Sequence, residues 1–564
     1  MNTVTSRDER RGAKAAFAMR AGAVVAAAAV ASVLTVSAGA SSAGTLTVCP
    51  TGCAFRQIAP AIAAAKSGDT VKVAAGTYQG GFTILVNLKL VGAGAHATII
   101  RGGGPVVTIG SPTASRKLTV SMTAVTITGG ENHAGGAYVH GGGVLAPDSN
   151  ATVAIDDAVI TDNRAEPTVT TISPQFSPPC PGGRQCPYAE ARGGGVYNAG
   201  TMTLSGTTVT DNQVAGVASS ADGGGIYSAT GSRLTLTDDT VARNQANASI
   251  PNGRFDIGGG IFVDTGGALT VKHSRVSDNR ASLTSALPVS AGGQPINIVA
   301  QAGGILVNDG APITIESTTI TDNSVSATDL SGSAGAINAA MGLGYGRLTL
   351  RDSVISHNRV SSTYATDGVS APVAASFDQG AQGATFEVDG GGTISRTQIT
   401  DNTASSTSPH GPAAENSGLF VGTPGGVSGS ATSPGPARVL VVQDSVISGN
   451  TVTASSPSGS ASVQGAGIVN LSLLKLDNVQ VRDNSGQATG RSGIAQGAGI
   501  WNGVSNPGTT VHLTLEHTVV THNSLAASPG LTVQGGGLFT TSPVTLTGST
   551  ISGNRPDDCV GAAC

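Results

Sequence analysis

Ile160-Thr161-Asp162-Asn163 and Val209-Thr210-Asp211-Asn212 are two copies of a motif, Ile/Val-x-x-Asn, that recurs along the chain and decides its fold. In every copy the side chain three residues before the asparagine is β-branched, and successive asparagines are 31 to 49 residues apart. Such recurrence is typical of a repeat protein. The eleven asparagines are Asn163, Asn212, Asn244, Asn279, Asn323, Asn358, Asn402, Asn450, Asn484, Asn523 and Asn554.

The residues upstream of each asparagine have the period of two that is typical of a strand with one buried face. The side chain eight residues upstream is always aliphatic, and the one ten residues upstream is aliphatic except at Gly392. A small or hydroxyl residue usually follows, where the chain must bend. About twenty residues before each asparagine, a glycine cluster precedes an apolar residue, as in Gly193-Gly194-Gly195-Val196. Each repeat is therefore predicted to hold three short strands.

Repeats of three strands, stacked at the strand spacing of roughly 4.8 Å, predict a parallel β-helix filled by columns of aliphatic side chains. An asparagine at the same corner of every coil tolerates left-handed backbone geometry, and its amide can bond the amides above and below it. The fold class is thus predicted to be all-β, a single-stranded parallel β-helix with an asparagine ladder.

The mature region begins with Phe55-Arg56-Gln57-Ile58 and an alanine-rich stretch to Lys66, followed by Ser67-Gly68-Asp69-Thr70. With these segments the chain resembles the pectin-lyase-like right-handed parallel β-helix family. Its repeats are similar to those of polymorphic outer-membrane proteins, although Ile or Val replaces the Phe of their Phe-x-x-Asn motif and no membrane barrel is indicated. The resemblance implies a right-handed coil and an N-terminal helical cap, but no single activity, because this fold hosts lyases, hydrolases and adhesins.

In that cap, Ile58, Ile62 and Ala65 fall on one side of a helix that would plug the open end of the coil.

Residues 1–40 are predicted to be a secretory signal peptide. Five basic and two acidic side chains from Arg7 to Arg20 precede the uncharged run Ala21–Val36, and Ala38-Gly39-Ala40 fits a cleavage site. We assign residues 41–110 to the N-terminal cap and first coils, and residues 111–564 to the β-helix with lateral loop insertions. The protein is therefore expected to be secreted and extracellular, without membrane association after signal cleavage.

The six cysteines fall in three close pairs, and an even count in an exported chain predicts local disulfides. A metal site would need Cys-x-x-Cys or histidine partners at ligand spacing, which the sequence lacks. We therefore expect no metal and no other cofactor. With a helical cap at one end and a disulfide at the other, both ends of the coil should be blocked, and a monomer is expected. The pairs are Cys49 with Cys53, Cys180 with Cys186, and Cys559 with Cys564.

Charged residues make up 11% of the chain, and loss of residues 1–40 removes five positive and two negative charges, so that the net charge of −4 becomes −7. No basic cluster is dense enough to hold nucleic acid or anionic lipid. Aromatic residues make up only 3%, and the single tryptophan, Trp501, shares its column with Tyr197 and Tyr227. Stacking between coils is its expected role.

Nearly all variation in repeat length falls between an asparagine and the next glycine cluster. These insertions leave the coil at one corner, so they should stack along one side. Insertions on one face of a solenoid often mark the binding face, but tolerated surface loops would look the same. The longest insertions are Arg164–Arg192, Arg280–Ala302, Arg359–Gln379 and Thr403–Arg438.

The residues that directly precede the eleven asparagines form a further column, which is mostly polar and is here called the pre-ladder column. Its side chains are predicted to point outward. Asp162 with Asp211, and Asp278 with Asp322, would lie about 5 Å apart on adjacent coils. Such pairs can raise each other's pKa, hold Ca²⁺, or act as the acid and base of a glycoside hydrolase. The alternative, which the sequence favours, is that each aspartate bonds backbone amides of its own turn. These four are the candidate catalytic residues.

Two functions follow from these patterns. The favoured one is a secreted structural or interaction protein that contacts extracellular polysaccharide or cell-surface proteins through its stacked insertions. The alternative is a polysaccharide lyase or glycoside hydrolase of the pectin-lyase-like class. The acidic and basic signatures of polygalacturonases are absent as a set, and no repeat departs from the pattern to supply an active site, so a non-catalytic role is favoured.

Overall fold

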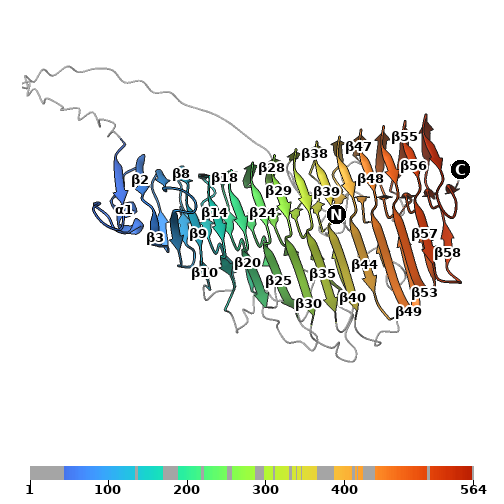
Figure 1. The fold of residues 1–564 in the computed structure, drawn as a ribbon, viewed down its shortest axis with the longest axis horizontal. Helices are drawn as coiled ribbons and strands as arrows, with labels where there is room; N and C mark the ends of the chain where they lie inside the picture. Colours follow the sequence, from blue (N-terminus) through green and yellow to red (C-terminus); the bar gives the residue numbers. More distant parts are fainter. Residues whose placement is uncertain are drawn as a thin grey trace, which may run out of the picture. The chain divides into compact units, whose positions relative to one another are not determined.

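A computed structural model of the chain shows a succession of parallel strands and, in the described residues, one short helix (Figure 1). The predicted signal peptide, residues 1–40, and the pair Cys180 and Cys186 lie outside the described residues. The structure describes residues 43–133, 138–168, 189–217, 221–250, 257–285, 297–308, 312–329, 333–337, 339–344, 346–364, 386–409, 413–415, 417–422, 438–504, 509–561 and 564.

One coil, read from its first strand, shows how the sequence pattern becomes structure. β13 (Ala151–Asp156) and β14 (Val159–Thr161) form two walls, and β17 (Val196–Asn198) forms the third. Between the second and third walls the chain leaves the coil in a lateral arm, which begins with β15 (Arg164–Ala165) and ends with β16 (Glu190–Arg192). The three predicted strands are present, and the arm adds others.

Equivalent strands of successive coils pair in parallel, so that each position of the repeat forms a column. The columns facing inward merge into one aliphatic core. Burying one such side chain stabilises by roughly 1.5–3 kcal/mol, so this core is the main stabilising element of the fold. Sheet A runs from β1 (Thr45–Val48) to β60 (Val544–Thr547), sheet B from β3 (Gly76–Gln79) to β61 (Thr550–Ser552), and sheet C from β4 (Phe82–Ile84) to β62 (Cys559–Gly561).

The asparagine ladder is continuous from Asn163 to Asn554. Each side-chain Nδ2 donates to the Oδ1 of the ladder asparagine in the next coil at 2.8–3.0 Å. It also donates to a carbonyl of the preceding coil, as from Asn212 to Ile160 at 2.9 Å. The Oδ1 accepts a second bond, from the backbone N–H of the neighbouring asparagine, and Asp558 ends the ladder at 3.0 Å from Asn554. The buried amides thus have all their partners.

The left-handed residue at this corner is the one before each asparagine, which corrects the expectation that the asparagine itself takes this conformation. Asp162 has φ 54°, Asp211 φ 57° and His357 φ 57°. The asparagine can therefore turn its side chain inward to the ladder while its neighbour makes the bend. Asp and Gly, which tolerate this region, fill most of the pre-ladder column.

A second polar ladder lies at the corner between sheets A and B, five residues before most of the ladder asparagines. The Ser445 hydroxyl accepts the N–H of Thr397 at 3.1 Å and donates to the Gln443 carbonyl at 2.6 Å. The same contact joins Thr318 to Ser353 at 3.1 Å. The hydroxyl residues predicted at the bend are therefore hydrogen-bond partners between coils.

The glycine clusters are required by close packing against the ladder and the arm. A Cβ on Gly195 would lie 2.9 Å from Cγ of Asn212, and a Cβ on Gly194 would lie 2.4 Å from the carbonyl oxygen of Gln213, where the next arm begins. Neither site has room for a side chain, because the ladder asparagine and the first residue of the arm lie at the same corner of the coil.

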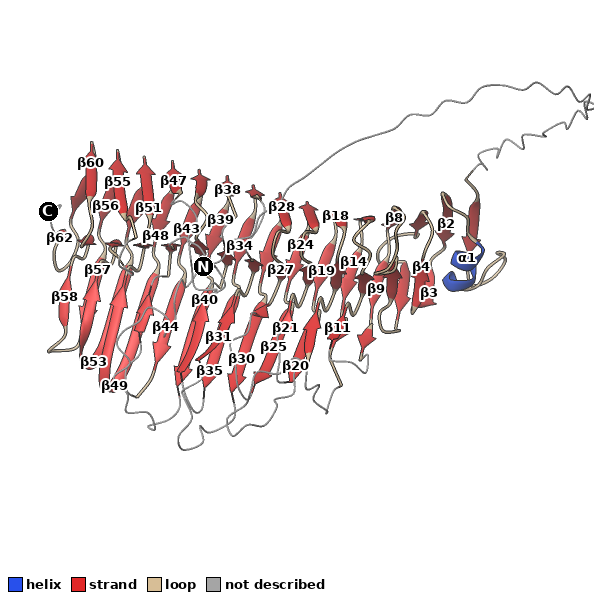
Figure 2. Ribbon diagram, turned by 180° about the vertical axis from the view of Figure 1, so that it is seen from behind, coloured by secondary structure: helices blue, strands red, loops and turns tan. Residues whose placement is uncertain are grey.

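The lateral arms pair with one another into a further parallel sheet, sheet D, which projects from the coil (Figure 2). The described ends of the insertions are thus strands, where loops were predicted. Ser/Thr alternates with Ala/Val along them, and the Ala/Val side chains pack into a second core between outgoing and returning segments. The strands of sheet D are β10 (Glu131–Asn132), β15, β20 (Gln213–Val217), β25 (Gln245–Ile250), β30 (Arg280–Ser285), β35 (Ser324–Asp329), β40 (Arg359–Tyr364), β44 (Thr403–Thr407), β45 (Ala413–Glu415), β49 (Thr451–Gln464), β53 (Ser485–Gln496), β57 (Ser524–Ala527) and β58 (Thr532–Gln534).

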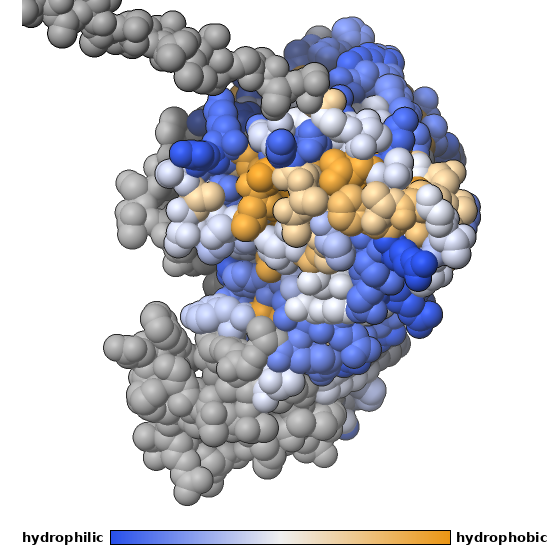
Figure 3. Space-filling view, turned by 90° about the vertical axis from the view of Figure 1, so that its left-hand side faces the viewer, coloured by the Kyte–Doolittle hydropathy of each residue, from blue (hydrophilic) through white to orange (hydrophobic). Residues whose placement is uncertain are grey.

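The N-terminal end of the coil is closed by the predicted helix, α1 (Ile58–Ala64), which buries Ile58 and Ile62 against the first strands. A disulfide joins Cys49 to Cys53 beside it. Figure 3, which looks onto this end, shows an apolar band across it. Within α1, Ala59 and Ala63 are exposed. The described helix is too short to cross a bilayer.

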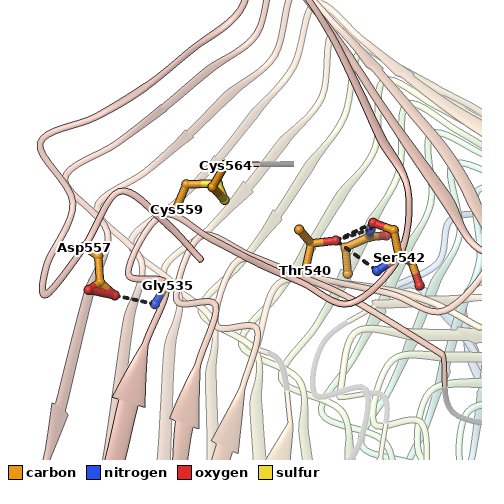
Figure 4. The surroundings of a disulfide bond; sticks show 7 residues. Gly535, Thr540, Ser542, Asp557, Cys559 and Cys564 are labelled. Atoms are coloured by element: carbon orange, nitrogen blue, oxygen red, sulfur yellow. Dashed lines mark hydrogen bonds between the residues drawn. A yellow bond between two sulfur atoms is a disulfide. The ribbon is translucent and has the colours of Figure 1, made fainter. Parts of the chain in front are cut away.

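The C-terminal end is closed only in part. The chain after Asn554 returns to the coil, where Asp557 accepts the N–H of Gly535 at 2.8 Å and β62 pairs with β59 (Leu538–Thr540) (Figure 4). A disulfide joins Cys559 to Cys564. This segment covers the ladder and sheet C but leaves β60 and β61 as the last strands of sheets A and B. The predicted blocking of this end by the disulfide is therefore incomplete.

Candidate functional site

The four aspartates predicted as candidate catalytic residues lie in the exposed pre-ladder column, as their spacing indicates. The Asp162 carboxylate accepts the Thr161 hydroxyl at 3.1 Å. Asp322 is held in the same way by its own preceding threonine, at 2.9 Å. Both contacts lie within one turn, as the structural interpretation expects, but the donor is a threonine hydroxyl and not the backbone amide that was expected.

Asp211 is further held by an arginine from the next coil. The Arg243 guanidinium donates to its two carboxylate oxygens at 2.9 and 2.8 Å. Partial burial acts to raise the pKa of Asp211, but the hydrogen bonds from Arg243 and Thr210 outweigh it, and the pKa is lowered. Asp211 thus lacks the raised pKa that two neighbouring carboxylates can give each other. A carboxylate with a lowered pKa is a poor general acid.

The structure assembles a different polar group, which sequence reasoning missed. The Arg192 cluster comprises Glu190, Arg192, Asp222, Tyr227 and Asp264. Arg192 forms ion pairs with Glu190, on its own strand, and with Asp222, at 3.5 Å, on β21 (Ala221–Asp222) of the next arm. Its guanidinium lies 4.8 Å from the centre of the Tyr227 ring, a cation–π contact. The Tyr227 hydroxyl in turn donates to Asp264 at 2.8 Å.

An aromatic stack accompanies this cluster. It begins with His140, on β11 (Tyr138–His140), which pairs with β16, and continues along the outward column of sheet C. The rings of His140 and Tyr197 are 4.5 Å apart, those of Tyr197 and Tyr227 5.4 Å, and those of Tyr227 and Phe262 5.2 Å. Farther along, Trp501 stacks on Phe539 at 6.4 Å. The predicted stacking between coils is thus present.

The electrostatics of the cluster favour a fixed ionic core. Burial and the nearby Arg192 lower the pKa of His140 to about 4, so that its ring is neutral at neutral pH. Burial opposes the charge of Arg192, but anionic neighbours such as Asp222 raise its pKa. For Asp264, the Thr265 N–H and the Tyr227 hydroxyl overcome the effect of burial, and its pKa is lowered. The cluster joins the returning arm strands to sheet C.

Asp239 is a further unusual carboxyl group, because it occupies a position of the hydroxyl ladder. Its oxygens accept the N–H groups of Thr207 and Thr237, both at 2.7 Å, and the residue is 2% exposed. Burial raises its pKa to about 7 in spite of these bonds.

Residues 113–299 match the family model described as the right-handed beta helix region. The chain is a right-handed parallel β-helix. The matched part of this β-helix contains the Arg192 cluster, Asp239 and the first coils of the ladder. No curated protein matches the chain. The family match supports the right-handed coil over residues 113–299, and the activity has to be inferred from the residues.

Replacing Asp239 by asparagine is expected to remove a pH dependence of the β-helix's stability. Its pKa is raised on folding, from 3.8 to about 7, so the folded state holds a proton that the unfolded state has lost between these values. The contribution of this group to the free energy of unfolding is therefore greatest below pH 4. It falls by roughly 1.4 kcal/mol per pH unit as the pH rises from there to about 7. Because an amide does not titrate, the difference between the unfolding free energies at pH 5 and pH 8 should be smaller in Asp239→Asn than in the wild type, measured by urea unfolding at both pH values.

Asp238→Asn is the matched control, because the Asp238 side chain is 67% exposed. It should keep the fall in stability with rising pH, because burial, and not the charge of Asp238, is the largest cause of the raised pKa of Asp239. A profile for Asp239→Asn that parallels the wild type would contradict the assignment of a buried, protonated carboxyl.

Within the described part of the β-helix, no group of three or more His, Cys, Asp or Glu side chains is arranged to hold a metal ion. The Arg192 cluster could have been noticed in the sequence, because Arg192 and Asp222 both directly precede a glycine triplet. Its acidic partners come from three different repeats, however, and their pairing depends on register that the sequence pattern alone does not give.

Proposed function

We propose that this β-helix is an exported, non-catalytic scaffold that binds neutral, hydroxyl-rich extracellular polymers through the outer face of its lateral arms. The observation that carries the proposal is the composition of sheet D. We call its outward-facing residues the arm face. The interaction role predicted for the insertions is retained, with rigid strands in place of loops.

The arm face consists of columns of small polar side chains, one residue per coil in each column. The strand registers place Ser326, Ser361 and Ser405 in one column and Thr328, Thr363 and Thr407 in the next. All six are at least partly exposed. The columns continue through Thr453 and Ser455 of β49. Neighbouring residues of a column are about 4.8 Å apart, as paired strands require.

Charge and chemistry favour a neutral partner. From β30 onward the two columns carry no charged residue, and Arg280 and Arg359 stand in the column nearest the coil. Hydroxyl groups both donate and accept hydrogen bonds, as the hydroxyls of a neutral polysaccharide do. A rigid array loses little conformational entropy on binding, so many weak contacts can add up. Two arginines are too few to hold a polyanion.

The test is binding of the chain without residues 1–40 to neutral polysaccharides such as cellulose and to acidic ones such as polygalacturonate. The double variant Ser361→Glu/Ser405→Glu, on adjacent coils of the arm face, should weaken binding to the neutral polymer at least about tenfold, or about 1.4 kcal/mol. The matched control is Thr314→Glu/Thr349→Glu, which also places two carboxylates on adjacent coils but on the outer face of sheet A.

Equal loss in both double variants would contradict an arm-specific surface. The enzyme alternative is tested in the same reactions, by following unsaturated products and reducing ends with and without Ca²⁺. Turnover that is abolished by Asp211→Asn would replace the scaffold proposal with a lyase or hydrolase acting at the pre-ladder column.

A further inference from the structure

We infer that the C-terminal end of the β-helix is a self-association surface, through which two copies of the chain join end to end. We call the surface formed by β60 and β61 the C-terminal face. This inference is independent of the polymer-binding proposal, because it concerns the end of the coil and not the arms.

Core positions become exposed at the C-terminal face. In the preceding coil, Leu515 and Val520 are fully buried, at 0% exposure. In the same columns of the last coil, Leu546 is 45% exposed and Ile551 is partly exposed. The apolar core therefore continues to the surface at this end, and covering it would extend the packing that already joins each coil to the next.

The strand edges at this face lack the usual protection against pairing. Edge strands are normally blocked by charged side chains, proline or a bulge. The segment from Val544 to Ser552, which contains both edge strands, has no charged residue and no proline. Within β60 and β61 no charges oppose those of a second copy, so these two strands can pair through their outer edges. The charged residues at this end, Arg555, Asp557 and Asp558, belong to the segment that covers the ladder and sheet C.

The partner that fits is a second copy meeting the same face. A partner must present two strand edges around an apolar cross-section, which is the shape of a coil end. The N-terminal end of this chain does not offer it, because α1 lies over the first coil. Two C-terminal faces are related by a two-fold axis, and the assembly closes at two copies because only α1-capped ends remain.

Sedimentation and small-angle scattering of the chain without residues 1–40 test the inference. We expect a concentration-dependent mass of two copies and a longest dimension close to twice that of the monomer. Leu546→Lys should raise the dissociation constant at least tenfold. Thr547→Lys, which adds a charge to the exposed side of β60 without altering the core, should do the same while circular dichroism stays unchanged. Leu85→Lys is the matched control, since Leu85 is 65% exposed near the other end.

Each other outcome overturns the inference. A wild-type mass of one copy at every concentration would remove the interface, and retention of the dimer in both lysine variants would place it elsewhere. Masses that grow beyond two copies would indicate head-to-tail assembly through the apolar N-terminal end. A dimer whose longest dimension equals that of the monomer would indicate side-by-side association, for example through the arms.

Discussion

Asn323→Ala is expected to lower the free energy of unfolding by about 4 kcal/mol, because each buried group that loses its partner costs about 1–3 kcal/mol. Asn323 is fully buried in the middle of the ladder. Its Oδ1 accepts from both the backbone N–H and the side chain of Asn279, at 3.1 and 3.0 Å. Its Nδ2 donates to the Val276 carbonyl at 3.0 Å. Alanine would strand that N–H and that carbonyl in the coil wall, where water cannot replace the amide.

Denaturant unfolding followed by far-ultraviolet circular dichroism measures this loss. Asn247→Ala is the matched control, since Asn247 lies on the outer face of sheet D and is partly exposed. Its effect should stay within about 0.5 kcal/mol, as for most surface substitutions. A loss below 1 kcal/mol for Asn323→Ala would show that the ladder adds little to stability.

Arg192→Met is expected to destabilise by about 3–5 kcal/mol, the usual result of removing one partner of a buried ion pair. Glu190 and Asp222 are each 3% exposed and would lose their positive partner. The aliphatic stem of methionine keeps part of the packing on Tyr227, so the loss reports mainly on charge. Thermal unfolding should show a lower midpoint, and the triple variant Glu190→Gln/Arg192→Met/Asp222→Asn should recover most of it.

Arg243→Met provides the comparison, because this arginine also pairs with an aspartate but its side chain is 59% exposed. Exposed pairs contribute about 0–1 kcal/mol, so a small effect is expected. If both methionine variants behaved alike, burial would not be the factor that gives the Arg192 cluster its strength.

The ladder and the core were predictable from the sequence because every coil needs the same residue types at the same positions. The β-branched residue before each asparagine and the aliphatic pair upstream recur at constant spacing, so a one-dimensional pattern fixes their columns. The position of the left-handed residue was not predictable in the same way. Asp162 and Asn163 both tolerate that conformation, and only the coordinates show which one bends and which one turns inward.

The strands of the arms and the Arg192 cluster could not be predicted from the sequence pattern, for a different reason. In segments such as Thr451–Gln464, alternating Ala and Val indicate strands, but Ser, Thr and Ala are also common in loops. Residues that meet in the cluster belong to repeats of unequal length, so no constant spacing connects them. The four predicted aspartates were placed in the correct column, but their bonding partners, above all Arg243, decide their chemistry.

The ladder amides all point the same way, each Nδ2 toward the following coil, so every coil offers an acceptor on one side and a donor on the other. Any coil is therefore equivalent to its neighbours as a junction. Duplication or excision of one complete turn rejoins matching surfaces and alters only the length of the rod. Loss of a single residue within a wall would instead exchange the inner and outer side chains. Evolution of such a chain can accordingly proceed in whole modules.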